Sequence, residues 1–291
     1  MVTKTTPPRK SSNTSVSEQD LSVCPNGESF VLPLDKDYAA EYKRLSKLVE
    51  THRRLGREIV VVMGVGFVGA VMAGVVADAV DKDSQPTKFV IGMQRPSQRS
   101  FWKIPYLNRG IAPVEAEDPE VARMIHRCVV EKKSLTATFT YDVLDLADTV
   151  IVDVQCDYHK KTFGDVRQGH ADIKALEDCL KIIGSKIQPH CMVLIETTVP
   201  PGTTEYVAYP IVKKEFERRG LKGKEPLLAH SFERVMPGKN YVASVKDFWR
   251  VCSGINKEAR RRVVDFLTEV LNTEKYPLTV LDRPIESETC K

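Results

Sequence analysis

Short apolar runs alternate along the chain with longer segments in which apolar residues recur every three or four positions. The first run, residues 58–63, reads Glu-Ile-Val-Val-Val-Met. An unbroken β-branched run of this length is typical of a parallel strand that is buried on both faces. Comparable runs predict further strands at 88–93, 135–140, 149–154, 192–196, 227–230 and 278–281. Because helical segments lie between several of these runs, the pattern predicts an α/β fold with a doubly wound, mostly parallel sheet.

The helical segments are recognised by apolar residues that fall on one face. Tyr38, Tyr42 and Leu45 have this spacing in the segment before the first strand. Asn256 precedes the last stripe, where its side chain is expected to cap the helix. The spacing predicts helices over 35–54, 67–80, 173–187 and 259–270.

The beginning of the chain differs in composition from the rest. Residues 1 to about 30 are rich in Ser, Thr, Pro and Lys, as in TKTTPPRKSSNTS. Such a segment buries too little apolar surface to offset the entropy lost on ordering. We therefore expect a disordered tail over residues 1–34, ahead of the predicted leading helix.

Charge and cysteine usage exclude several classes of protein. The 43 basic and 39 acidic residues leave a net charge of only +4, which does not indicate a nucleic-acid partner. The seven cysteines are scattered and form no CxxC pair. This is typical of reduced thiols in the cytoplasm, so we expect neither a disulfide framework nor a metal site. No apolar run is long enough to span a membrane, so no membrane partner is expected.

A glycine-rich turn between the first predicted strand and the next predicted helix carries the strongest chemical indication. It reads Gly64-Val65-Gly66-Phe67-Val68-Gly69, a GxGxxG motif. The first glycine permits the tight turn, the second lets the backbone approach a pyrophosphate, and the third lets helix and strand pack closely. The helix N-terminus offers free N–H groups to the phosphates. The setting favours dinucleotide binding over a turn needed only for packing, or over a methyltransferase loop.

The end of the second predicted strand bears on the choice of cofactor. An NAD site usually has an acidic residue there, which binds the ribose hydroxyls. Here Gln94 occupies that place, Arg95 follows it, and Arg99 lies close behind. Gln94 can still hydrogen-bond a ribose, whereas a neutral residue beside arginines tolerates a 2′-phosphate. We expect NAD as the cofactor and leave NADP open.

Several further motifs occur in a characteristic order. Ile195-Glu196-Thr197-Thr198-Val-Pro-Pro-Gly-Thr-Thr ends a predicted strand, and one of its last two threonines is expected to cap the next helix. Together with the glycine turn, these motifs resemble the UDP-glucose/GDP-mannose dehydrogenase family. The form ERVMPG resembles members that oxidise UDP-N-acetylhexosamines. The other motifs of the resemblance are 107–110, 147–148, 231–238 and 288–291.

The resemblance implies an NAD(P)-dependent nucleotide-sugar 6-dehydrogenase, which oxidises a C6 alcohol twice to a uronic acid. It implies that Thr198 orders water and contacts the nicotinamide end, that Glu233 is a general base acting through water, and that Lys291 stabilises the oxyanion. The resemblance also places Arg234 and Val235 with Glu233 and Lys291 on the substrate side. The implied cofactor contacts are Gly64, Val65, Gly66, Phe67, Val68, Gly69, Gln94, Arg95, Cys156, Glu196 and Thr197.

The resemblance also implies a domain order. Residues 35–277 would form the NAD(P)-binding Rossmann-like domain, and residues 278–291 would begin the family's central linker helix. The family's nucleophilic cysteine lies well downstream of the lysine that Lys291 matches, so Cys290 is not its equivalent. We therefore expect the chain to be the N-terminal portion of the enzyme, and to bind cofactor without completing the oxidation alone.

Two features leave alternatives open. The family usually has a Thr-Pro pair where this chain has Cys156-Asp157, and a thiol is a poor hydrogen-bond donor. The residues alone are also compatible with a non-catalytic dinucleotide-binding module or with another hydroxy-acid dehydrogenase. The expected partner is a nucleotide sugar, while a homodimer and a separate chain carrying the C-terminal half both remain open.

Overall fold

We analysed a computed structural model of the chain, which describes residues 20–160, 162 and 169–291. The strands are β1 (Leu21–Val23), β2 (Ser29–Val31), β3 (Glu58–Met63), β4 (Lys88–Met93), β5 (Leu135–Thr138), β6 (Thr149–Val152), β7 (Asp157–Lys160), β8 (Gly169–Asp172), β9 (Met192–Ile195), β10 (Leu227–His230), β11 (Val251–Gly254) and β12 (Thr279–Val280). The helices are α1 (Asp35–Arg54), α2 (Phe67–Asp78), α3 (Lys103–Asn108), α4 (Pro119–His126), α5 (Lys174–Lys186), α6 (Tyr209–Arg218), α7 (Tyr241–Lys246), α8 (Lys257–Val270) and α9 (Pro284–Thr289). Short π- or 3-10-helical turns are η2 (Arg127–Glu131), η3 (Tyr141–Leu146) and η4 (Thr204–Ala208).

The central sheet has eight strands in the order β12-β11-β10-β9-β6-β3-β4-β5. All neighbouring pairs are parallel except β10 and β11, which are antiparallel. The chain runs outward from β3 to β5, then crosses back to β6 on the other side of β3. This reversal is the topological switch point of a doubly wound sheet, where ligands bind at the carboxyl ends of the strands. The predicted fold class is confirmed.

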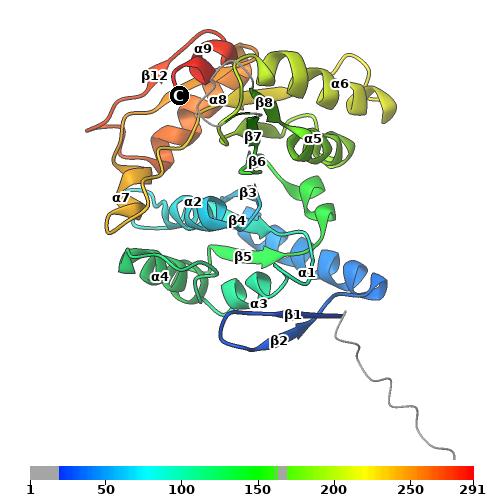
Figure 1. Cartoon of the computed structure of the whole chain (residues 1–291), viewed down its shortest axis with the longest axis vertical. Helices are drawn as coiled ribbons and strands as arrows, with labels where there is room; N and C mark the ends of the chain where they lie inside the picture. Colours follow the sequence, from blue (N-terminus) through cyan, green and yellow to red (C-terminus); the bar gives the residue numbers. More distant parts are fainter. Residues whose placement is uncertain (1–19, 161, 163–168) are drawn as a thin grey trace, which may run out of the picture.

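Helices cover both faces of the sheet (Figure 1). One buried apolar cluster joins the sheet to α2, α4, α7 and α8, and a second joins it to α1, α5 and α6. The sheet strands β3 and β6 are fully buried apart from Glu58 at the start of β3. Burial on both faces explains why these strands have unbroken apolar runs rather than alternating ones.

Several predicted boundaries are displaced by a few residues. The runs expected to extend to 140, 154 and 196 end as strands at Thr138, Val152 and Ile195. The helix expected over 67–80 ends at Asp78. These strands end where the chain leaves the sheet, and the polar residues that follow them line the site described below.

The sequence interpretation of residues 1–34 as a disordered tail is wrong for residues 21–31, while residues 1–19 lie outside the described part of the chain. Strands β1 and β2 pair as an antiparallel hairpin. The hairpin packs on α3, where the Phe30 ring meets Tyr106 edge-on at 5.9 Å. Arg109 forms an ion pair with Glu28 at 2.7 Å. The contacts come from a distant segment, so local composition could not indicate them.

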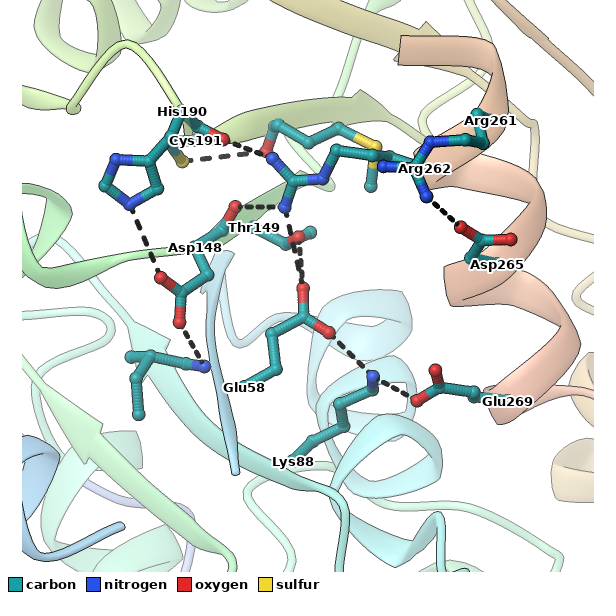
Figure 2. Close-up of polar contacts among 12 residues, drawn as sticks. Glu58, Lys88, Asp148, Thr149, His190, Cys191, Arg261, Arg262, Asp265 and Glu269 are labelled. Atoms are coloured by element: carbon teal, nitrogen blue, oxygen red, sulfur yellow. Dashed lines mark hydrogen bonds and ion pairs between the residues drawn. The ribbon is translucent and has the colours of Figure 1, made fainter. Parts of the chain in front are cut away.

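A polar network ties α8 to the amino end of the sheet (Figure 2). Lys88 is almost fully buried, and its ammonium contacts Glu58 on β3 at 2.6 Å and Glu269 on α8. Burial by itself lowers the pKa of Lys88, but the two carboxylates raise it overall. Arg262, also on α8, donates to the backbone oxygens of His190 and Asp148. Arg262 therefore has a structural role at the amino end of the sheet.

The last residues remain part of the same sheet. Strand β12 pairs in parallel with β11, so residues 279–280 extend the sheet. Helix α9 starts at Pro284 and packs against β10 and β11. Asn256 caps α8 as predicted, since its side chain accepts from the Ala259 N–H at 2.9 Å. No helix in the described part of the chain is long and apolar enough to cross a membrane.

Candidate functional site

The glycine turn lies at the switch point, between the carboxyl ends of β3 and β4 and the start of α2. Gly64 has φ +97°, a conformation that side chains with a Cβ rarely adopt. A Cβ on Gly69 would lie 1.9 Å from the Gly64 carbonyl oxygen, so only glycine permits this approach of helix and turn. A Cβ on Gly66 would meet nothing within 4 Å. Gly66 therefore borders open space, as a position facing a pyrophosphate must.

Helix α2 leaves its first N–H groups available to a ligand. Gly66 is the N-cap residue and provides no side-chain cap. Free N–H groups at a helix N-terminus, together with the positive end of the helix dipole, bind phosphate oxygens. The Tyr241 hydroxyl holds this end in place by donating to the Phe67 carbonyl at 2.8 Å, and the two rings stack. The turn therefore fits the pyrophosphate of a dinucleotide.

A cavity of about 1030 Å³ opens in front of the turn and runs along the carboxyl edge of the sheet. Its volume is at the upper end of the range for small-molecule and cofactor sites. The cavity connects residues that are far apart in the sequence. Its lining includes Gly64, Gly66, Phe67, Val68, Gly69, Gln94, Arg95, Lys103, Asp153, Cys156, Thr197, Thr198 and Glu233.

Gln94 supports the turn with its side-chain amide, at the position where an NAD site usually has a carboxylate. Its side-chain oxygen accepts from the Val65 N–H at 3.1 Å. Its amide nitrogen donates to the Ser100 hydroxyl at 3.2 Å. Both ends of the amide are therefore engaged within the protein. Arg95, the next residue, is exposed at the rim of the cavity.

Asp153 lies directly after β6 in the wall of the cavity, and sequence analysis did not single it out. Both carboxylate oxygens are buried, and neither has a hydrogen-bond partner among the described residues. Burial raises the pKa of Asp153 well above its ordinary value, and Glu196 and Glu233 add to the effect. Folding therefore favours the neutral form of this carboxyl group. Its position after a buried strand at the switch point could have indicated it.

The Thr197-Thr198 segment leaves β9 at the far side of the cavity. Thr197 is held by its N–H, which donates to the Val152 carbonyl at 3.2 Å, while Thr198 is exposed to the cavity. The expectation that a threonine caps the next helix is wrong. Instead, the buried carboxylate of Glu288 accepts from Gly202 N–H, from Thr204 N–H at 2.8 Å and from the Thr204 hydroxyl at 2.6 Å. Glu288, the acid of the 288–291 motif, therefore caps the start of η4 from a distant part of the chain.

Glu233 lines the same cavity and forms an ion pair with Lys291, which is not among the lining residues. The Lys291 ammonium lies 2.9 Å from Glu233 Oε1 and 2.7 Å from the Glu233 carbonyl oxygen. The other carboxylate oxygen accepts from the Val235 N–H at 2.7 Å. Their side chains are 14% and 28% exposed, so both remain accessible. A carboxylate and an ammonium held together at one edge can transfer a proton and stabilise a negative charge.

Glu196 has no exposed surface. Its Oε1 forms an ion pair at 2.8 Å with Arg250, which is also buried. Arg250 donates in addition to the Phe232 carbonyl at 2.7 Å. This pair fixes the backbone on both sides of the cavity wall, so Glu196 lies behind the site rather than in it. Arg234 points its guanidinium over the Phe248 ring, 4.7 Å from the centroid, and is absent from the cavity lining.

Cys156 lines the cavity beside Asp157. Burial raises the pKa of the Cys156 thiol, and Asp157 and Asp172 raise it further, so the sulfur is a neutral thiol at physiological pH. All seven cysteines of the chain are free. Within the described residues, no cluster of His, Cys, Asp and Glu has the arrangement of a metal site.

Comparison with known proteins places this geometry among dehydrogenases. Residues 58–271 match the sequence profile of the UDP-glucose/GDP-mannose dehydrogenase family, NAD binding domain. Over 153 residues the chain is 28% identical to a UDP-N-acetyl-D-mannosamine dehydrogenase of Pyrococcus horikoshii, covering 53% of this chain and 33% of that protein. Over 144 residues it is 30% identical to Protein CapL of Staphylococcus aureus, covering 48% of this chain and 31% of that protein.

Solved structures agree with these matches. The NDP-N-acetyl-D-galactosaminuronic acid dehydrogenase from Methanosarcina mazei Go1 has a TM-score of 0.70 and 29% identity, covering 85% of this chain and 48% of that chain. A UDP-glucose dehydrogenase from Pyrobaculum islandicum has a TM-score of 0.62 at 20% identity, covering 80% of this chain and 48% of that chain, a likeness of fold. The chain thus spans about half the length of these solved chains, and the matches cover about a third of the curated relatives.

Proposed function

The chain belongs to the UDP-glucose/GDP-mannose dehydrogenase family, and we propose that it forms the cofactor-binding portion of an enzyme that oxidises the C6 alcohol of a nucleotide sugar to the uronic acid. The matched residues are the NAD-binding domain of that family, so NAD is the cofactor. The chain spans about half of the solved relatives, so the oxidation itself, the sugar and the partners are part of the proposal.

One observation carries the proposal. A single cavity joins the glycine turn to Thr198 and Glu233, which come from segments more than a hundred residues further along the chain. A dinucleotide whose pyrophosphate binds at Gly66 would lie in the same cavity as the carboxylate of Glu233. A glycine turn that serves only packing needs no such cavity. A module that only binds the cofactor does not need an acid paired with a lysine there.

The residues at this edge have complementary roles in the proposed reaction. NAD bound in the cavity would supply the hydride acceptor. Glu233 would take the proton of the sugar hydroxyl through an ordered water, which Thr198 helps to position. Lys291, 2.9 Å from Glu233, would stabilise the negative charge that develops on the C6 oxygen. Val235 and Arg234 follow Glu233 in the chain and would complete the substrate side.

We propose a UDP-N-acetylhexosamine as the substrate. The support comes from two relatives, one described as a UDP-N-acetyl-D-mannosamine dehydrogenase and the other as an NDP-N-acetyl-D-galactosaminuronic acid dehydrogenase. The ERVMPG segment at 233–238 points the same way, and Glu233 lies at the cavity. The cavity wall near Glu233 is therefore where sugar specificity is expected.

A chimera tests the proposed function directly. Residues 20–291 are joined to the C-terminal half of the Methanosarcina mazei relative, and NAD reduction is followed with UDP-N-acetylmannosamine, UDP-N-acetylglucosamine and UDP-glucose. We expect NAD reduction with a UDP-N-acetylhexosamine, and its loss in the Glu233→Gln chimera with NAD binding retained. A chimera that binds NAD but reduces it with none of the sugars contradicts the proposal and favours a non-catalytic binding module.

We also propose a cytoplasmic location. All seven cysteines are free, and unpaired thiols are typical of a reducing compartment.

The state of assembly is the remaining part of the proposal. A homodimer and a complex with a separate chain predict different masses in light scattering, so this measurement distinguishes them.

A further inference from the structure

The segment that follows β4 departs from the usual design of an NAD site. In such sites a carboxylate at the end of the second strand binds the adenosine ribose hydroxyls and repels a 2′-phosphate. Here the equivalent side chain is Gln94, whose oxygen is already engaged by the Val65 N–H at 3.1 Å. The position therefore carries no negative charge, and its hydrogen-bonding groups are used within the protein.

Two cations border the cavity at this end instead. Arg95 follows Gln94, and Lys103 begins α3 nearby; both line the cavity. Within the described residues, neither side chain forms an ion pair with a carboxylate. Lys103 is partly buried, and this burial lowers the pKa of its ammonium, with no acid offsetting the effect. A partly desolvated ammonium without a counter-ion is a favourable partner for a phosphate.

The segment between these cations is held by the N-terminal hairpin, which lies before the residues that match the family. Ser22 donates its hydroxyl to the Gln98 carbonyl at 2.8 Å and accepts from the Trp102 N–H at 3.1 Å. Ser97 and Ser100 bond to each other at 2.7 Å within the segment. The loop that bears the cations is thus fixed at both sides, and little ordering entropy would be lost on binding an anion.

We propose that Arg95 and Lys103 form a subsite for a phosphate on the 2′-oxygen of the adenosine ribose, so that the site binds NADP(H) as well as NAD(H). This proposal rests on the cofactor site proposed above. Two of the acids that line the cavity already pair with cations: Asp178 with Lys174 and Lys181, and Glu233 with Lys291.

Calorimetric titration with NADH and NADPH tests the subsite. We expect NADPH to bind wild-type protein within about tenfold of NADH. The double variant Arg95→Ala, Lys103→Ala should lose about tenfold or more in affinity for NADPH while NADH changes little, because each charge-assisted contact to a phosphate contributes measurably. Gln94→Asp should weaken NADPH selectively, since it restores a negative charge at the strand end. Lys82→Ala is the matched control, an exposed lysine at the opposite edge of the sheet.

A second pair of ligands isolates the phosphate itself. Adenosine 2′,5′-bisphosphate should bind more tightly than adenosine 5′-monophosphate, and the difference should shrink at high salt. The subsite is refuted if NADPH binds about a hundredfold or more weakly than NADH, or if the double variant weakens both cofactors equally while its thermal unfolding is unchanged. If neither cofactor binds the wild-type protein, it is the proposed function that fails, since the subsite presupposes it.

Discussion

Replacing Asp153 with Asn should stabilise the protein at neutral and alkaline pH. Both side-chain oxygens of Asp153 are buried, and neither has a hydrogen-bond partner among the described residues. Glu196 and Glu233 lie near enough to disfavour a second negative charge. Asparagine has nearly the same shape and carries no charge at any pH. The variant therefore removes only the ionisation and leaves the packing around Gly69 intact.

The sign of the effect follows from proton binding. The unfolded carboxyl has an ordinary pKa of 3.8, whereas burial first, and then Glu196 and Glu233, raise the pKa of Asp153 in the folded protein well above that value. The folded state holds the proton more tightly, so the stability due to this group is complete below the unfolded pKa and falls as pH rises towards the folded pKa. Desolvation of a buried group without a hydrogen-bond partner costs about 1–3 kcal/mol, and more when the group is charged, so the ionised carboxylate carries a penalty that the uncharged amide avoids. We expect Asp153→Asn to raise the free energy of unfolding by about 1–3 kcal/mol near pH 8. The increase should fall towards zero near pH 4.

Urea unfolding across this pH range, followed by tryptophan fluorescence, measures the difference. Asp83→Asn is the control, because Asp83 is exposed in a loop and its substitution should change the free energy of unfolding little at any pH. If Asp153→Asn is less stable than wild type at high pH, or if its advantage does not depend on pH, the carboxyl is not held neutral and the reasoning is refuted.

Three other substitutions test the packing on which the site depends. Gly69→Ala would place a Cβ 1.9 Å from the Gly64 oxygen. We expect the free energy of unfolding, measured by thermal unfolding, to fall by about 1–3 kcal/mol and NADH binding in calorimetry to weaken. Unchanged binding would show that the turn is not tightly packed. In the wild-type protein two backbone N–H groups donate to the Glu288 carboxylate, and Glu288→Gln replaces it with an amide. The free energy of unfolding in urea should fall by about 1–3 kcal/mol. An unchanged unfolding midpoint would show that Glu288 does not act as a cap. Lys88→Met leaves the carboxylates of Glu58 and Glu269 without their shared cation. The free energy of unfolding in urea should fall by about 1–3 kcal/mol, a loss that is limited because water reaches both carboxylates. A more stable variant would contradict a stabilising role for Lys88.

The sequence predicts the sheet and the glycine turn well because both depend on local patterns. Buried parallel strands require unbroken apolar runs, and the turn requires glycine at positions 64 and 69 for reasons of backbone geometry. Asn256 was likewise predicted as a cap, because an N-cap contact joins residues only three apart. Each of these features leaves its mark within a few residues of the chain.

The features that were missed join distant segments. Glu288 caps a helix start more than eighty residues earlier, a role that no local spacing indicates. Arg250 and Glu196 form a buried pair 54 residues apart. Ser22 holds the loop before Trp102 from within a segment whose composition indicates disorder. Which side of a strand end becomes a cavity wall is decided by tertiary packing, so the burial of the Asp153 carboxylate oxygens is seen only in the structure.

We expect this chain to bind a nicotinamide dinucleotide at the turn of Gly64, Gly66 and Gly69. Calorimetric titration of the purified chain and of its Gly66→Val variant with NADH tests this binding site. Position 66 borders open space, so valine should be tolerated by the fold while it obstructs the pyrophosphate. We expect one NADH site per wild-type chain and its loss in Gly66→Val, with the thermal unfolding midpoint nearly unchanged. Equal NADH affinity in the two proteins, or no binding to a folded wild-type chain, would contradict it.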